Sequence, residues 1–130
     1  METQVQIQDF FGPFVCDGDS ISAQQDQFSF TATITHDPDT RPTDFDCYSP
    51  ENIKSWKKED WYFGVMGVSA SYNDVLLDDC IVAIGGVNVN FPESDNSYLN
   101  EIAKELFDEA LDEAHRALSM LRQSVCQEVA

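Results

Sequence analysis

Apolar and polar side chains alternate along the segment QFSFTATIT, residues 27–35. The apolar positions are Phe28, Phe30, Ala32 and Ile34, and glutamine, serine and threonine stand between them. A period of two residues is typical of a β-strand with one buried face and one face in water. The segment therefore predicts a strand whose outer face is rich in threonine.

Two longer apolar segments, residues 61–71 and 75–86, flank the short link Tyr72-Asn73-Asp74. Asn and Asp tolerate left-handed backbone angles, so the link predicts a tight turn and the two segments a β-hairpin. Both segments are partly apolar on both faces, and we expect them to lie more centrally in the sheet than residues 27–35. Their glycines indicate β-bulges or a closely packed helix. These are Gly64, Gly67, Gly85 and Gly86.

The rest of the first 60 residues gives shorter signals. Residues 3–8 alternate between apolar and polar and predict an edge strand, and Asp17-Gly18 indicates a turn. A Pro- and Asp-rich connection contains Ser49-Pro50-Glu51, which offers an N-cap, a first-turn proline and a first-turn acid. We expect one short helix there, ending near Lys58.

The C-terminal segment contains neither glycine nor proline after residue 94, and its apolar residues recur at helical spacing. We expect one long helix from residue 97 to about residue 125. Its apolar arc faces the sheet; the arc consists of Leu99, Ala103, Leu106, Phe107, Ala110, Ala114, Ala117, Leu118 and Leu121. The predicted fold class is α+β, with an antiparallel sheet of three to five strands packed on one long C-terminal amphipathic helix.

The opposite arc of this helix carries a row of four carboxylates, spaced by four, three and four residues. The row consists of Glu101, Glu105, Asp108 and Asp112. At a rise of about 1.5 Å per residue it spans roughly 16 Å. The carboxylates follow one another at helical spacing, so we expect them on the face away from the sheet.

Composition sets further limits. A chain of 130 residues fits a single domain, residues 1–130, and can bury a core without metal or disulfide. The net charge is −17, no apolar run is long enough to cross a bilayer, and residues 1–19 contain no basic residue. We therefore expect a cytoplasmic protein that has no membrane partner.

The four cysteines are far apart in the chain, at Cys16, Cys47, Cys80 and Cys126, and form no C-x-x-C pair. This spacing argues against structural zinc. We expect reduced, partly buried thiols, and no cofactor.

The stretch LDEAHRAL, residues 111–118, contains the tetrad Asp-Glu-Ala-His that names a class of helicases. In those enzymes the tetrad follows a buried strand and works with a phosphate-binding loop that contains Gly-Lys. This chain has no Gly-Lys pair, and its tetrad lies within the helical pattern. We interpret it as part of an amphipathic helix, with Asp112 and His115 exposed.

Three short motifs resemble, in order, the blocks of the SGNH hydrolases. Gly18-Asp19-Ser20-Ile21 resembles the Gly-Asp-Ser block, Asn73-Asp74 is similar to the Gly-x-Asn-Asp block, and Asp112 with His115 fits the Asp-x-x-His block. The resemblance implies Ser20 as nucleophile, the Gly18–Ser20 region and Asn73 as oxyanion donors, His115 as base and Asp112 as its orienting partner. Ser71 replaces the family's Gly and the chain is short for its layered core, so a serine hydrolase is the remote alternative.

Two binding chemistries fit the sequence poorly. Aspartates gather at residues 37–46 and at Asp78-Asp79, but their spacing does not match an EF-hand loop, and we expect no dedicated metal site. Trp56-Lys57-Lys58 and Trp61-Tyr62-Phe63 combine bases with aromatics, as single-strand binders do. The 24 acids oppose direct contact with nucleic acid. We expect Trp61 and Phe63 in the core and the lysines exposed.

The acidity itself has two interpretations, solubility or the binding of a basic partner. Duplex DNA places a phosphate about every 3.4 Å along each strand, and a helical row of carboxylates is a comparable line of charge. We therefore expect a non-catalytic protein that binds a basic surface of a nucleic-acid-handling protein, as DNA-mimic anti-restriction or anti-CRISPR inhibitors do. The predicted contact residues are Glu101, Glu105, Asp108, Asp112, Asp37, Asp39, Asp44 and Asp46.

A homo-oligomeric structural or assembly protein with incidental acidity is the alternative. The two-sided apolar strands and a spare apolar flank of the helix, at Ile102, Leu111 and Met120, would form a homodimer interface.

Overall fold

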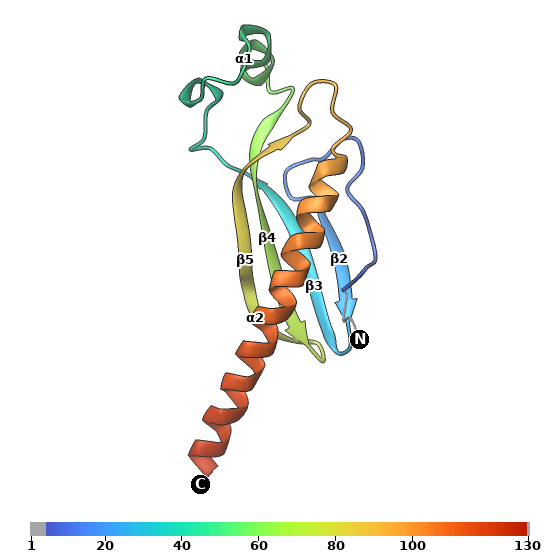
Figure 1. Ribbon diagram of the computed structural model, residues 1–130, viewed down its shortest axis with the longest axis vertical. Helices are drawn as coiled ribbons and strands as arrows, with labels where there is room; N and C mark the ends of the chain where they lie inside the picture. The colour runs from blue at the N-terminus through green and yellow to red at the C-terminus, as the bar shows by residue number, and fades with distance from the viewer. Residues whose placement is uncertain (1–4, 130) are drawn as a thin grey trace.

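The computed structural model describes the backbone of residues 5–129 and the side chains of residues 5–123. Five antiparallel strands form one sheet, and a long C-terminal helix, α2 (Ser97–Val129), lies across one face of it (Figure 1). The predicted α+β architecture is confirmed. The strands are neighbours in chain order: β1 (Gln6–Ile7), β2 (Ser20–Gln25), β3 (Phe28–His36), β4 (Tyr62–Tyr72) and β5 (Val75–Val89).

The predicted β4–β5 hairpin is confirmed at its turn. Asn73 and Asp74 both have positive φ, 49° and 66°, as the two central residues of a type I′ turn require. This turn matches the right-handed twist of the flanking strands, so local chemistry is enough to pair them.

The predicted positions of β4 and β5 are wrong. We expected both hairpin strands to lie more centrally than β3, but the sheet order places β3 in the centre, β4 beside it and β5 at an edge. One side of β5 packs under α2, while Val75, Leu76 and Ile84 are exposed. Three register irregularities let the 15 residues of β5 pair with the 11 of β4, and Gly86 has φ 68°. The extra residues shift the alternation along β5, which makes the strand look apolar on both faces.

β2 was not predicted. Its segment SISAQQ has only two buried apolar residues, Ile21 and Ala23, and that is too short a pattern to stand out. Tertiary pairing with β1 and β3 makes it a strand. At the N-terminus, the strand predicted for residues 3–8 is reduced to β1, and residues 3–4 lie outside the described part of the chain.

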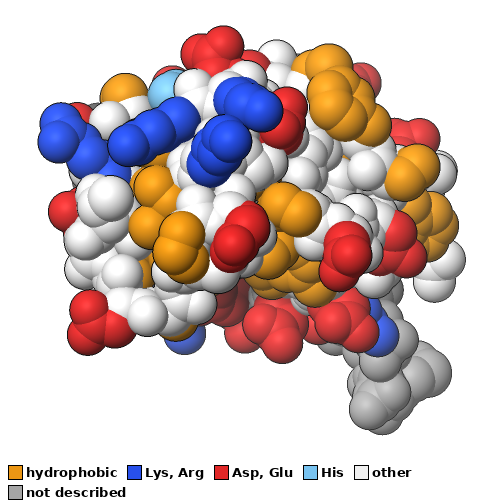
Figure 2. All heavy atoms as spheres, turned by 90° about the horizontal axis from the view of Figure 1, so that it is seen from above, with side chains coloured by type: hydrophobic (Ala, Val, Ile, Leu, Met, Phe, Trp, Pro, Cys, Tyr) orange, Lys and Arg blue, Asp and Glu red, His pale blue; other side chains and the backbone are white. Residues whose placement is uncertain are grey.

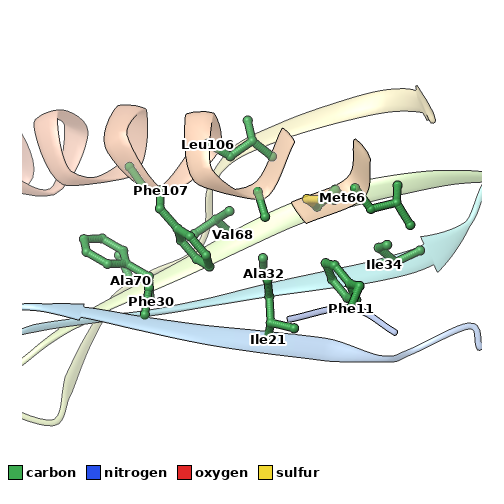
Figure 3. Packing of buried hydrophobic residues seen from close by; sticks show 14 of the residues in the cluster. Phe11, Ile21, Phe30, Ala32, Ile34, Met66, Val68, Ala70, Leu106 and Phe107 are labelled. Carbon is green, nitrogen blue, oxygen red and sulfur yellow. The ribbon is translucent and has the colours of Figure 1, made fainter. Parts of the chain in front are cut away.

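The core lies between the sheet and α2, as the helical periodicity predicts. Figure 3 shows Phe107 of α2 pointing toward Phe30 of β3, and the two ring centroids are 6.4 Å apart. The buried helix residues are Leu99, Ala103, Leu106, Phe107, Ala110, Leu111 and Ala114. Each such side chain adds hydrophobic stabilisation, about 1.5–3 kcal/mol for a large one.

The helix continues past the end of the sheet (Figure 1). Beyond the strands its apolar arc has nothing beneath it, so Leu121, which we expected to face the sheet, is 52% exposed. Among the described residues no helix is long and apolar enough to cross a membrane.

Candidate functional site

The acidic row on α2 is exposed along its whole length. Glu101, Glu105, Asp108 and Asp112 all face solvent, because the apolar arc on the other side of the helix is buried against the sheet. The row therefore lies on a rigid helix, and packing in the core fixes which side of that helix faces solvent. Among the described side chains, the one ion pair joins Arg116 to Glu113, which is not one of these four acids, so no ion pair neutralises any carboxylate of the row.

The loop acids lie in the connection between β3 and α1 (Pro50–Lys57), which includes the short helix η1 (Pro42–Asp44). Asp37 accepts hydrogen bonds from the Thr40 hydroxyl at 2.7 Å and from the Asp39 N–H at 3.0 Å. Both hydrogen bonds lower the pKa of Asp37, and the one from the Thr40 hydroxyl has the larger effect. Asp39, Asp44 and Asp46 are exposed. The loop acids thus form an ordered turn and an exposed acidic stretch.

The loop and the row start at the same end of the molecule, the end at which α2 begins (Figure 1). Among the described residues no hydrogen bond or ion pair joins the two groups. The row then runs along α2 away from the loop. A partner contacting both would have to cover the loop end and the helix together.

The residues of the hydrolase resemblance are not brought together. Ser20 is level with Thr33 of β3 and, through it, with Gly67 of β4. Gly67 is six residues from Asn73, so Ser20 and Asn73 are about 20 Å apart along the strands. Ser20 also precedes the buried Ile21, so it points to the face opposite α2.

His115 lies on the other face, at the hairpin end. Its ring is edge-on to Phe28, with centroids 4.7 Å apart, and Phe28 pairs with Tyr72 next to the turn. The helicase-like tetrad is thus one turn of α2, with Asp112 exposed and Ala114 buried. Although His115 is exposed as expected, it covers a core phenylalanine.

The structure also bears on metal binding and on the exposure of the cysteines. Within the described residues no group of three or more His, Cys, Asp and Glu side chains could hold a metal ion. Cys16, Cys47 and Cys80 are free and exposed, so the expectation of partly buried thiols is wrong for these three. They lie in two loops and in the bulged edge strand, where little packs over them. The side chain of Cys126 lies outside the described residues.

Sequence reasoning missed a cleft of about 510 Å³ beside α1, where β3 ends and β4 begins. Its walls combine aromatic, acidic and basic side chains. They are Asp17, His36, Trp56, Lys57, Glu59, Trp61 and Tyr62.

One wall of the cleft is α1, which has no fully buried residue and is held by hydrogen bonds at both its ends. Its N-terminus is capped as predicted, because the Ser49 hydroxyl accepts from the Asn52 N–H at 3.1 Å. The Trp61 indole N–H donates to the Asn52 carbonyl at 2.8 Å, which ties the helix to the start of β4. Trp61 itself is fully buried and packs against Phe63 and Phe91.

The opposite wall is held by backbone contacts. Asp17 accepts a hydrogen bond from the His36 N–H at 2.9 Å, and Tyr62 donates its hydroxyl to the Val15 carbonyl at 3.2 Å. Burial, with the charges of Asp17 and Asp19, raises the pKa of Tyr62 to about 12. The phenol therefore stays protonated at neutral pH, mainly because it is buried, and the two carboxylates add a smaller effect of negative charge.

The aromatic and basic segments noted in the sequence meet at this cleft. Trp61 and Phe63 are buried and Lys57 and Lys58 exposed, as predicted. The contribution of Asp17 to the cleft was not visible in the sequence, because Asp17 stands 40 residues before Lys57 in the chain. Figure 2 looks onto this end and shows Lys and Arg side chains gathered beside a His, with Asp and Glu around them.

Comparisons of this chain with protein-family models, with curated proteins and with solved structures find no match.

Proposed function

We propose that this protein is a non-catalytic interaction protein that binds a basic surface of a nucleic-acid-handling protein or complex, and inhibits it as a DNA mimic. The observation that carries the proposal is the row of four exposed carboxylates on α2. A helix anchored by its buried arc presents these charges with little loss of backbone entropy on binding, which favours a rigid mimic over a flexible acidic tail.

Charge spacing supports the same proposal. Successive carboxylates of the row are three or four residues apart, or about 5 Å along the helix axis. Phosphates on one DNA strand repeat about every 3.4 Å. A cationic groove that binds phosphates would meet a sparser line of negative charge here. The exposed loop acids Asp39, Asp44 and Asp46 would extend the acidic surface at the end where α2 begins.

The test uses a neutralised row, E101Q/E105Q/D108N/D112N, and a matched control that removes four exposed acids elsewhere, D26N/E51Q/D74N/D79N. Each immobilised protein is exposed to nuclease-treated extract of the native host, and captured proteins are released with duplex DNA. We expect wild type and control to capture the same basic nucleic-acid-binding protein, releasable by DNA, and the row variant to lose it. If the row variant captures that protein as well as wild type does, the proposal is wrong.

The second candidate is a homo-oligomeric assembly protein, which is favoured by exposed apolar residues at the end where α2 passes the sheet. Val75 and Leu76 follow the hairpin turn there, and Met120 and Leu121 lie on the projecting helix. Of the predicted flank, only Met120 is free for such a contact, because Leu111 is buried and Ile102 partly buried. Residues 114–127 carry no acid, so two copies can approach there with the least repulsion.

Light scattering over a hundredfold range of concentration tests this second candidate. A dimer that M120E/L121E converts to a monomer would support it. A wild-type monomer at all concentrations would refute it.

A further inference from the structure

We propose that the cleft beside α1 binds the guanidinium or ammonium group of a basic side chain on the protein partner. That the bound group belongs to the protein partner rests on the proposed function. The preference of the cleft for a cation can be measured without the partner. The juxtaposition that carries it is two carboxylates, Asp17 and Glu59, beside the half-buried rings of Trp56 and Tyr62.

Aromatic faces and carboxylates together select an organic cation. The negative face of an aromatic ring attracts guanidinium or ammonium groups, and tryptophan does so most strongly. A carboxylate adds a directed, charge-assisted hydrogen bond. Neither group favours an anion. A cleft of about 510 Å³ admits a whole arginine or lysine side chain.

Hydrogen bonds orient the Asp17 carboxylate and fix the backbone at Glu59. Asp17 keeps its orientation through the hydrogen bond from the His36 N–H. Glu59 has φ 65° at the end of α1, where its N–H donates to the Trp56 carbonyl at 2.9 Å and the Asp60 N–H donates to the Ser55 carbonyl at 3.0 Å. This is the helix-ending arrangement that favours glycine. A glutamate at this position bears backbone strain, and it is one of the residues that line the cleft.

Two basic groups, Lys57 and His36, also line the cleft and would serve an anion instead. Lys57 is exposed on α1, and its long flexible stem lets the ammonium group turn to solvent. The His36 ring packs on Tyr62, with centroids 5.7 Å apart, as part of the wall. Asp19 adds its charge to that of Asp17 at Tyr62. The charges around the cleft therefore favour a cation over an anion, and replacing Lys57 should increase that preference.

Both tryptophans of the chain line the cleft, so intrinsic fluorescence reports on it directly. Wild type is titrated with N-acetylarginine methylamide, its lysine analogue and N-acetylglutamate methylamide at constant ionic strength. We expect a saturable change with the two cations, with dissociation constants on the order of 1 mM, and none with the glutamate analogue. Saturable binding of the glutamate analogue, or a merely linear response to both cations, would overturn the proposal.

Variants identify the groups responsible. D17N/E59G should weaken cation binding about fivefold, whereas D74N/D79N, which removes the same charge away from the cleft, should leave it unchanged. Lys57→Met should strengthen it. Asn retains the acceptor for His36 and Gly suits the backbone at residue 59, so both changes keep the fold, and circular dichroism checks this. Equal affinity in D17N/E59G and wild type would overturn the assignment.

The neutralised row variant separates the two proposals. Retained cation binding in the cleft together with unchanged partner capture contradicts the proposed function alone. Partner capture that depends on the row, without cation binding in the cleft, contradicts the cleft assignment alone.

Discussion

The side-chain amide of Asn96 donates a hydrogen bond to the side-chain carbonyl of Asn90 at 2.8 Å, in the connection between β5 and α2. Asn96 is fully buried, also donates to the Pro13 carbonyl at 3.1 Å, and accepts from the Asn90 N–H at 2.9 Å. The Asn90 amide in turn donates to the Val15 carbonyl at 2.8 Å. Two asparagines therefore fasten the N-terminal segment, including the loop that carries Asp17, to the start of α2.

Asn96→Ala should destabilise the protein by about 3 kcal/mol, because it leaves buried polar groups unpaired. Alanine also fits poorly at φ 63°, which asparagine tolerates. Urea denaturation followed by circular dichroism measures the loss. Gln24→Ala, at an exposed position of β2, is the control and should change stability by less than about 0.5 kcal/mol. A loss of similar size in both variants would mean that the network contributes nothing particular.

Glu59→Gly should stabilise the fold by about 0.5–1 kcal/mol, because it relieves the left-handed strain at the end of α1. Glu59→Ala, which keeps the strain and removes the carboxylate, is the matched control and should give no such gain. Thermal unfolding of the three proteins distinguishes them. Equal midpoints for the glycine and alanine variants would show that the backbone at residue 59 is not strained.

Ala114→Glu should destabilise the protein by about 3 kcal/mol or more, because it places an unpaired carboxylate in the core. Asp112→Asn, two residues away on the solvent face, should change stability by less than about 0.5 kcal/mol. Chemical denaturation of both variants compares the two faces of the tetrad. A harmless Ala114→Glu would contradict the orientation of α2 on the sheet.

Tyr62 should ionise near pH 12, later than an ordinary phenol. Burial and the nearby carboxylates favour the protonated form in the folded protein, so its contribution to stability is fully present below pH 10 and is lost as pH rises toward 12. Absorbance of tyrosinate at alkaline pH follows the titration. Tyr62→Phe should remove the component near pH 12 and leave the still later one of Tyr98, whose pKa is raised by burial. A Tyr62 component centred near pH 10 would disprove the shift.

The sequence alone determined the elements whose side chains repeat with one period or whose turns have their own chemistry. The two-residue alternation gave β3, the apolar arc gave α2, Asn73-Asp74 gave the hairpin, and Ser49 gave the start of α1. The exposure of the acidic row follows from the same periodicity. Local preferences suffice for these features because backbone geometry sets which side chains share a face.

Only the tertiary structure decided which strand lies at the edge and what gathers at the cleft. β5 is an edge strand because no further strand in the described part of the chain pairs with it, and its bulges hide that from a pattern of fixed period. Asp17 and Glu59 line the same cleft as Trp56 because the end of β3 and the end of α1 lie close together in space. Contacts between residues so far apart in the chain depend on how whole elements pack, and no local periodicity records them.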